Sequence, residues 1–300
     1  MKRWPRDWLL ALATLLLVLA ALLPPVTMER RVFSHMLVFD ITQSMNVADQ
    51  SIDGASLTRL AWGKRMALQA LAELPCGSRL GLSVFASRRT LMVLAPVEIC
   101  ANYDELEQAI NKVDSRMAWN QASVIARGLY TAIEAAAELP QPPSLLFISD
   151  GHSAPPVDEE NMPEFSLPPA PVRGVVMGVG SLMPQPIPRS DSSGRFIGWW
   201  EADQVVQRSR SEDAPDSQEH LSSLHERHLQ ALARVTGLTY ARIDSAAAFR
   251  RASQDPALAQ TLRVPTDVRW MPALVATLLL TMFFLPRRAD VSFDRVQTSA

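Results

Sequence analysis

One stretch, Met36–Met45, constrains the fold of this chain more than any other. Its apolar residues lead directly into Asp40, and the hydroxyl residues Thr42 and Ser44 follow at every second position. An apolar run of this length is typical of a strand that is buried on both faces of a parallel sheet. Asp40 would then lie at the carboxyl end of its strand, at the edge where open α/β sheets bind ligands. A carboxylate and two hydroxyls at this spacing can converge on one hard cation, most naturally Mg²⁺.

A second predicted strand has the same design. The apolar residues 145–148 are followed by Ser149 and Asp150, so a second carboxylate ends a buried strand. Between the two strands, Ser123 opens a predicted helix, where a serine has an ordinary role as a capping or first-turn residue.

Strands and helices alternate along the chain, which predicts an α/β fold with a doubly wound, mainly parallel sheet. The runs 80–85 and 90–94 are joined by so short a turn that we expect an antiparallel hairpin, at the edge of the sheet. Residues 51–56 are expected to form a polar loop. The other strands are expected at 36–40, 145–149, 172–178 and 239–243, and the helices at 57–74, 104–113, 123–136, 221–235 and 246–252.

The N-terminal region predicts a membrane anchor. Residues 8–28 carry no charge, and the length of this apolar run matches a bilayer span. Lys2, Arg3 and Arg6 precede it, which indicates a cytoplasmic N-terminus. A cleaved signal peptide is the alternative, although Pro24 and Pro25 stand where small cleavage-site residues are usual.

The C-terminal region contains a second apolar run, residues 270–285, which ends at an Arg pair, Arg287 and Arg288. The run is short for a span, and a buried C-terminal helix is the alternative. We expect an anchor over residues 1–30, a main domain over 31–262, a transmembrane helix over 268–286 and a cytoplasmic tail over 287–300. In a bacterium this topology places the protein in the inner membrane with its main domain in the periplasm.

The only two cysteines, Cys76 and Cys100, flank the predicted hairpin almost symmetrically. Antiparallel pairing brings the two ends of a hairpin together, and an oxidising compartment favours a disulfide. We therefore predict a Cys76–Cys100 bridge, with two free buried thiols as the alternative.

The order of these motifs resembles the von Willebrand factor A (vWA) family over roughly residues 33–255. The resemblance implies a metal-ion-dependent adhesion site, with Asp40, Thr42 and Ser44 in its first loop, Ser123 in its second and Asp150 in its third. The family usually has serine at the position of Thr42 and threonine at the position of Ser123. Both exchanges keep an oxygen ligand. Residues 180–188 resemble the membrane-anchored bacterial group that includes the Bat aerotolerance proteins. The anchored domain and the Asp40-x-Thr42-x-Ser44 motif resemble the vWA-type accessory proteins of methanol dehydrogenase clusters.

The resemblance also implies a function. The site would hold a divalent cation, Mg²⁺ first with Ca²⁺ or Mn²⁺ as alternatives, and a partner protein would offer an Asp or Glu to that cation. We expect a membrane-anchored accessory factor in the assembly or maturation of a periplasmic metalloenzyme such as methanol dehydrogenase. Other vWA proteins of the same system are further candidate partners.

The composition bears on the partner class. The 300 residues are 48% hydrophobic and 20% charged, with a formal net charge of -2, and no basic cluster lies outside the termini. This balance argues against nucleic acid as a partner.

An enzyme is the competing hypothesis, because a strand-terminal Asp40 followed by a hydroxyl is similar to the nucleophile of some phosphoryl-transfer enzymes. Such phosphatases need a second Asp two residues later, where this chain has Thr42. The sequence contains neither a phosphate-binding loop nor a serine nucleophile elbow. We therefore expect no catalysis.

Four histidines and an aromatic cluster complete the candidates. His220, His225 and His228 suggest either a zinc site or packed histidines at the edge of the core, and His152 either supports Asp150 or lies in a solvated loop. The segment 181–217 leaves its strand on the predicted metal side and carries Phe196, Trp199 and Trp200. These aromatic side chains are candidate anchors for a partner, with burial by their own loop as the alternative.

Overall fold

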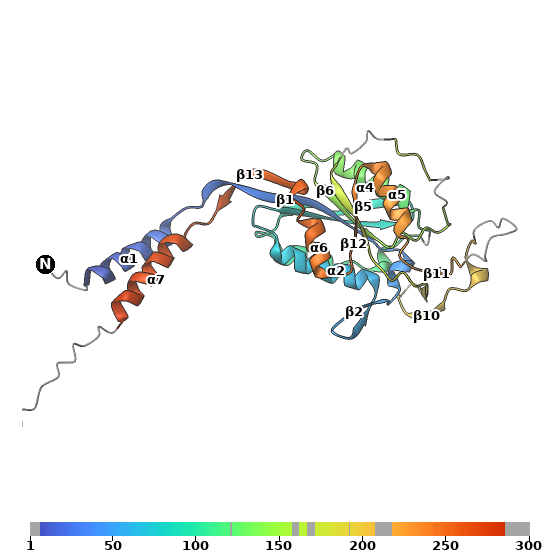
Figure 1. Cartoon of the computed structure of the whole chain (residues 1–300), viewed down its shortest axis with the longest axis horizontal. Coiled ribbons are helices and arrows are strands. Elements are labelled where there is room, and N and C mark those ends of the chain that lie inside the picture. Colours follow the sequence, from blue (N-terminus) through green and yellow to red (C-terminus); the bar gives the residue numbers. More distant parts are fainter. Residues whose placement is uncertain are drawn as a thin grey trace, which may run out of the picture. The chain divides into compact units, whose positions relative to one another are not determined.

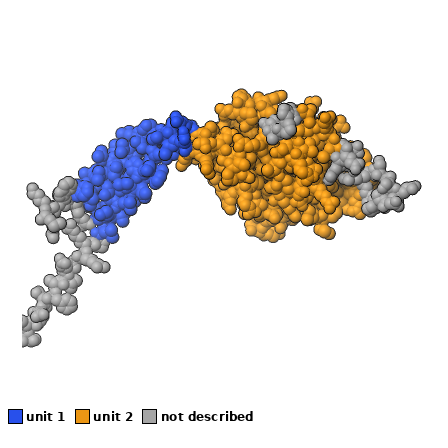
Figure 2. Space-filling model, turned by 45° about the horizontal axis from the view of Figure 1, so that its top comes forward, with its two compact units in different colours: residues 1–29, 263–300 blue, residues 30–262 orange. Residues whose placement is uncertain are grey.

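The computed structural model of the chain describes residues 7–120, 122–157, 162–166, 172–191, 193–207 and 218–285. The predicted tail 287–300 and the basic residues 2, 3 and 6 lie outside these ranges. The chain divides into two compact units (Figure 2), one of residues 30–262 and one that joins residues 1–29 to residues 263–300.

The larger unit is built on a mostly parallel sheet with the strand order β12-β7-β6-β1-β4-β5 (Figure 1). All neighbours along this path are parallel except β4 and β5, which form the predicted antiparallel edge hairpin. The mainly parallel α/β fold is therefore confirmed. The strands are β1 (Val26–Asp40), β4 (Arg79–Ala86), β5 (Arg89–Glu98), β6 (Ser144–Ser149), β7 (Gly174–Gly178), β12 (Thr239–Arg242) and β13 (Ala259–Thr266), which pairs with β1.

Helices cover both faces of this sheet, which explains the continuous apolar run in β1. Leu37 and Phe39 pack in one core with α2 (Arg59–Glu73), α3 (Tyr103–Lys112) and α6 (Ala246–Ser253). Met36 and Val38 point to the opposite face and pack with α4 (Ile125–Ala137) and α5 (Glu226–Thr236). Alternate side chains of one strand thus fill two separate cores.

Several expected elements differ from the structure because short strands pair where the sequence predicted a loop or a helix. The predicted polar loop at 51–56 is wrong, since β2 (Gln50–Ile52) and β3 (Ala55–Leu57) form a small hairpin there. The helix expected to begin at 221 begins at Glu226, because β11 (Leu221–Ser222) pairs instead with β8 (Gln185–Pro186). The segment between them also contains the antiparallel pair β9 (Pro188–Ser190) and β10 (Phe196–Trp199).

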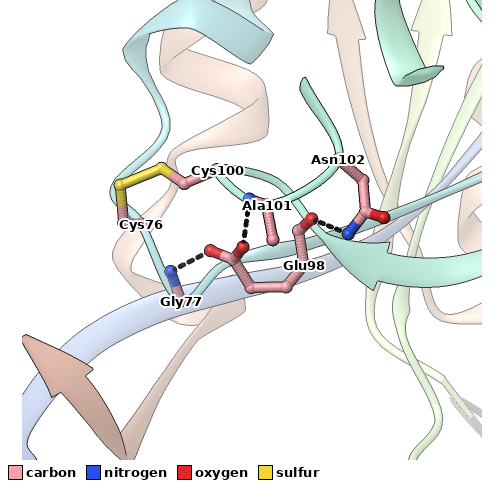
Figure 3. The surroundings of a disulfide bond; sticks show 6 residues. All are labelled: Cys76, Gly77, Glu98, Cys100, Ala101 and Asn102. Atoms are coloured by element: carbon pink, nitrogen blue, oxygen red, sulfur yellow. Dashed lines mark hydrogen bonds between the residues drawn. A yellow bond between two sulfur atoms is a disulfide. The ribbon is translucent and has the colours of Figure 1, made fainter. Parts of the chain in front are cut away.

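The predicted disulfide between Cys76 and Cys100 is confirmed, with the two Cα atoms 5.3 Å apart. It joins the segment after α2 to the segment after β5 (Figure 3). Beside it, the carboxylate of Glu98 accepts hydrogen bonds from the backbone N–H groups of Gly77 (2.7 Å) and Ala101 (2.6 Å). The bridge and this carboxylate together fix the two ends of the edge hairpin.

The smaller unit contains α1 (Asp7–Leu22) and α7 (Trp270–Phe284), which pack against each other. They have 16 and 15 residues, so they are about 24 Å and 22 Å long, shorter than the roughly 30 Å of a bilayer interior. Pro24 and Pro25 stop α1 before it uses the whole apolar run. Within the described ranges no helix is long and apolar enough to cross a membrane, so the structure does not support the two predicted spans.

One buried group of the larger unit makes its stability depend on pH. His35 lies on β1 with its ring 5.5 Å from that of Phe33, and its side chain is fully buried. Burial lowers the pKa of His35 to about 4 from an ordinary value of 6.5. Between these two values the unfolded chain takes up a proton that the folded chain does not, so the free energy of unfolding falls as the pH falls.

We therefore expect the free energy of unfolding to fall less between pH 6.5 and pH 4 in His35→Leu than in the wild type. The difference between the two decreases should reach roughly 3 kcal/mol at pH 4. Urea unfolding of the variant and the wild type at pH 7 and pH 4.5 measures the effect. Met36→Leu, a neutral exchange on the same strand, is the control and should leave the pH dependence unchanged. Identical pH dependence in His35→Leu and wild type would contradict the expectation.

Candidate metal centre

The two predicted carboxylates end neighbouring strands. β1 ends at Asp40, and Asp150 directly follows β6. The two strands are parallel and adjacent, with Phe39 opposite Ile148. β4 lies on the other side of β1, so the chain reverses its direction of winding between β1 and β6. Asp40 and Asp150 therefore lie at a topological switch point, where open α/β sheets form a crevice.

Asp40 is fully buried, and its two carboxylate oxygens have different hydrogen-bond partners. Oδ2 accepts a hydrogen bond from the Ser149 hydroxyl at 2.7 Å, within the floor of the site. Oδ1 accepts from the backbone N–H of Thr42 at 2.9 Å and from its hydroxyl at 2.7 Å. One oxygen is thus anchored to the sheet, and the other faces the loop after β1.

Asp150 repeats this arrangement. Its Oδ2 accepts from the Arg59 guanidinium at 2.5 Å and from the Ser222 hydroxyl at 3.0 Å. Its Oδ1 accepts from the Ser44 hydroxyl at 3.2 Å and from the backbone N–H of His152 at 3.0 Å. Oδ1 of Asp40 therefore faces the Thr42 hydroxyl, and Oδ1 of Asp150 faces the Ser44 hydroxyl.

Those two hydroxyls connect the carboxylates. Thr42 stands at the N-cap position of the short 3-10 helix η1 (Gln43–Asn46), and the hydroxyls of Thr42 and Ser44 lie 3.4 Å apart. The oxygens thus form a chain from Asp40 through Thr42 and Ser44 to Asp150, with neighbours 2.7, 3.4 and 3.2 Å apart. Adjacent oxygen ligands of an octahedral Mg²⁺ are about 3 Å apart. Both the chemistry and the spacing of these donors therefore fit a hard cation.

Ser123 lies near this chain of oxygens without joining it. Its hydroxyl donates to the backbone carbonyl of His152 at 3.1 Å, and its backbone bridges Ser87 and Ala154. The expected capping role is wrong, because α4 begins at Ile125 and its cap is the next residue, 124. Ser123 instead shares a cleft of about 270 Å³ with Thr42 and Ser44. It is therefore available to a cation or ligand in that cleft.

The two carboxylates differ in their electrostatics. Burial, together with the nearby charge of Asp150, raises the pKa of Asp40 to about 7. Burial also works against ionisation of Asp150, but the Arg59 guanidinium outweighs it and holds the pKa of Asp150 below its ordinary value. A bound divalent cation would favour the ionised form of both groups.

Sequence reasoning missed Arg59 and its second partner, Asp49. The Arg59 side chain is fully buried and forms ion pairs with Asp150 at 2.5 Å and with Asp49 at 2.6 Å. The available signal was its position directly after the cap of α2, because a helix dipole disfavours a cation in the first turn. A cation at that place needs acidic partners from elsewhere in the chain.

The histidines support the loop after β6. His152, for which a solvated loop was the alternative, is buried, and its ring lies 5.3 Å from that of His225. The backbone N–H of His225 donates to the carbonyl of Asp150 at 2.8 Å, and the ring of His228 bonds the carbonyl of Gly151 at 2.9 Å. In the part of the chain that the structure describes, no three His, Cys, Asp or Glu side chains form a metal-binding group. The hydroxyls would thus carry much of the coordination at the candidate site.

The aromatic residues of the segment 181–217 divide into two groups. Trp200 lines the cleft, and its indole N–H donates to the side-chain carbonyl of Gln43, in the metal loop. Phe196 and Trp199 lie on β10 with ring centroids 5.0 Å apart and are 57% and 52% exposed. Their own loop therefore does not bury Phe196 or Trp199.

Comparison with known proteins agrees with this architecture. Residues 35–152 match the family model described as the von Willebrand factor type A domain. Over residues 35–152 the chain is thus similar to vWA domains. No curated protein matches the chain.

Solved structures of similar fold include two membrane proteins of bacteria. An aerotolerance-related membrane protein from Bacteroides fragilis is 19% identical, with a TM-score of 0.49, over 74% of this chain and 98% of that chain. A membrane-spanning protein from Vibrio fischeri is 19% identical, with a TM-score of 0.30, over 71% and 93%. The PilB minor pilin from Streptococcus sanguinis is 11% identical, with a TM-score of 0.40, over 76% and 61%.

We predict that the full chain binds one Mg²⁺ at the vWA domain and that Asp150→Asn weakens binding at least about tenfold, because an amide cannot replace a ligating charge. Isothermal titration calorimetry after treatment with EDTA measures the stoichiometry and affinity. Asp53→Asn, the same exchange in the exposed β2–β3 turn, is the control and should bind as the wild type does. Equal affinity in Asp150→Asn and Asp53→Asn would refute the assignment of this site.

Proposed function

We propose that this protein is a non-catalytic binding module. Its vWA domain takes a divalent cation, Mg²⁺ first, and binds a carboxylate of a partner protein through that cation. The chain of oxygens from Asp40 to Asp150, at the floor of a cleft, is the observation that carries this proposal. Thr42, Ser44 and Ser123 supply the uncharged donors.

The charges of the site favour an anionic ligand from the partner. Asp40 and Asp150 neutralise one divalent cation, and the hydroxyls add no charge. Hydroxyl ligands and a few carboxylates leave a hard cation with positions that water or an added oxygen can fill. An Asp or Glu of a partner offers such an oxygen with a negative charge, which makes it a better ligand than a neutral group.

Beside the oxygens the cleft is mostly apolar, although Gln43, Gln204 and Glu219 also line it, so the partner would need more than a carboxylate. Ile187, Trp200 and Val206 line it together with Thr42 and Ser44. Large apolar side chains also lie exposed on the same segment of chain; they are Leu182, Met183, Phe196, Ile197, Trp199 and Val206. Apolar contacts next to a charged anchor give a binding site its discrimination, because any accessible carboxylate can reach a cation.

The enzyme hypothesis has less support. A nucleophilic Asp40 would have to reach a substrate, yet its side chain is fully buried and its oxygens accept hydrogen bonds from Thr42 and Ser149. The position at which a second carboxylate would act as acid and base is Thr42. A binding role needs only that the cation be reached.

We further propose that the module acts in a bacterial membrane system, as an accessory factor for a periplasmic metalloenzyme such as methanol dehydrogenase or for other vWA proteins. The apolar terminal segments and the disulfide support a location at the outer face of the inner membrane. The resemblance of residues 180–188 to the anchored bacterial group supports a membrane system. The Asp40-x-Thr42-x-Ser44 motif, which resembles that of the methanol dehydrogenase accessory proteins, supports the choice of system.

We predict that affinity capture with the full chain retains a partner in Mg²⁺ and loses it in EDTA or with Asp40→Ala, because each removes the bridging cation. Trp199→Ala should weaken capture several-fold while Mg²⁺ affinity stays at the wild-type value, since this side chain is exposed and contacts no ligand of the cation. Quantitative mass spectrometry of the captured proteins gives the ratios.

Val235→Ala provides the matched control, because Val235 is also exposed and apolar but lies at the end of α5. It should capture as the wild type does. Capture that persists in EDTA, or that Trp199→Ala and Val235→Ala weaken equally, would contradict the proposed function.

A further inference from the structure

Arg59 is a charged side chain at the very start of α2, and the structure exposes none of it. Burying a guanidinium is costly unless charged and polar groups surround it. Here Nε and Nη2 donate to Asp49 at 3.0 and 2.6 Å, and Nη1 donates to Asp150 at 2.5 Å. Nη1 also donates to the hydroxyl of Ser222 at 2.6 Å, and Nη2 to its backbone carbonyl at 3.1 Å. One side chain thus binds three separate segments of the chain.

Two of these contacts close the base of the segment 181–222, which we call the insertion. At its start, the backbone N–H of Ser181 donates to the same Asp49 oxygen that Arg59 binds, at 2.9 Å. At its end, Ser222 contacts Arg59 directly. The start and the end of the insertion therefore meet at one guanidinium. The insertion in turn supplies Ile187 and Trp200 to the cleft beside the candidate metal loop.

The backbone next to the insertion is shaped for this contact. Gly180 has a φ of +128°, and a Cβ atom there would lie 2.8 Å from Nε of Arg59. Only glycine combines this conformation with so close an approach. The guanidinium can thus lie directly against the chain where it leaves β7.

The third contact sets the orientation of a candidate metal ligand. Arg59 and Ser222 both hold Oδ2 of Asp150, which turns Oδ1 toward Ser44. A carboxylate released from these partners could rotate and present either oxygen. The orientation of Asp150 and the closure of the insertion therefore depend on the same side chain.

We propose that Arg59 is the positioning residue of the whole binding face: it fixes the Asp150 carboxylate toward the cation loop and fastens both ends of the insertion that lines the cleft. This inference rests on the proposed function for the role of the cation. Arginine suits the role because its planar fork donates in several directions at once, whereas lysine is a point donor on a flexible stem.

The test uses the full chain with Arg59→Lys, which keeps the charge and loses the fork. We expect hydrogen exchange to rise at least about tenfold in both ends of the insertion, residues 181–187 and 218–224, and Mg²⁺ affinity to fall at least about tenfold. Ser222 and Asp150 would lose hydrogen bonds from the guanidinium, and Asp49, which holds Ser181, would lose the fork that fixes it. Exchange is measured by mass spectrometry without cation, and affinity by calorimetry.

Thr58→Ala is the matched control, because Thr58 caps the same helix by accepting a hydrogen bond from the N–H of Ala61 at 3.1 Å and is outside the buried cluster. It should lower the melting temperature and leave exchange and Mg²⁺ affinity as in the wild type. Ser222→Ala, which keeps both ion pairs, replaces Arg59→Lys if that variant does not fold. It should raise exchange in residues 218–224 and weaken Mg²⁺ binding.

A lower melting temperature with wild-type exchange and affinity would overturn the inference, because Arg59 would then stabilise the helix alone. A change in hydrogen exchange alone, or in Mg²⁺ affinity alone, would overturn it as well. Arg59 would then not both fasten the insertion and orient Asp150. If the wild type binds no Mg²⁺, the proposed function fails, and the exchange of the two ends of the insertion then decides the role of Arg59.

Discussion

The ion pairs of Arg59 with Asp150 and Asp49 allow the fold to bring three aspartates together at one edge of its sheet. Asp40 and Asp150 are fully buried, and the side chain of Asp49 is only 5% exposed. One guanidinium offsets one of these three charges, so two negative charges remain when all three are ionised. The raised pKa of Asp40, caused by burial and by Asp150, is one way in which the protein relieves that excess. A bound divalent cation, as we propose, would be another, because its charge would match the two negative charges that remain.

The same charges explain why the loops of this edge form one site. The strands β1, β6 and β7 are parallel neighbours, so their carboxyl ends all lie at this edge of the sheet. Each loop then contributes a polar group to a common cluster: Ser44 after β1, Asp150 after β6 and the backbone of Ser181 after β7. Buried polar groups are stable only when they are paired, so each loop depends on the others for its conformation.

Sequence patterns predicted what depends on local residues. The apolar runs ending in Asp40 and Asp150 gave both carboxylates their places at strand ends, and the short turn before residue 90 predicted the edge hairpin that the disulfide now closes. The membrane spans were expected from hydropathy, which does not show where a helix stops. The structure has only short helices in those two regions, within the residues that it describes.

The sequence alone did not show which distant segments of the chain contact each other. β11 looked like the start of a helix because Leu221 and Leu224 fit a helical stripe, and only its partner β8 makes it a strand. His152 looked solvated because the loop around it is polar, while the ring of His225 covers it. Arg59 was not among the candidates, because its acidic partners are distant in sequence: Asp49 lies 10 residues before it and Asp150 lies 91 residues after it.

We propose that a divalent cation binds where the oxygens of Asp40, Thr42, Ser44 and Asp150 meet. Crystals of the full chain grown with Mn²⁺ test it most directly, because Mn²⁺ scatters anomalously and favours the same oxygen ligands as Mg²⁺. We expect one anomalous peak within coordination distance of the hydroxyls of Thr42 and Ser44. At saturating Mn²⁺, the absence of a peak at these oxygens, or a peak at another site alone, would contradict it.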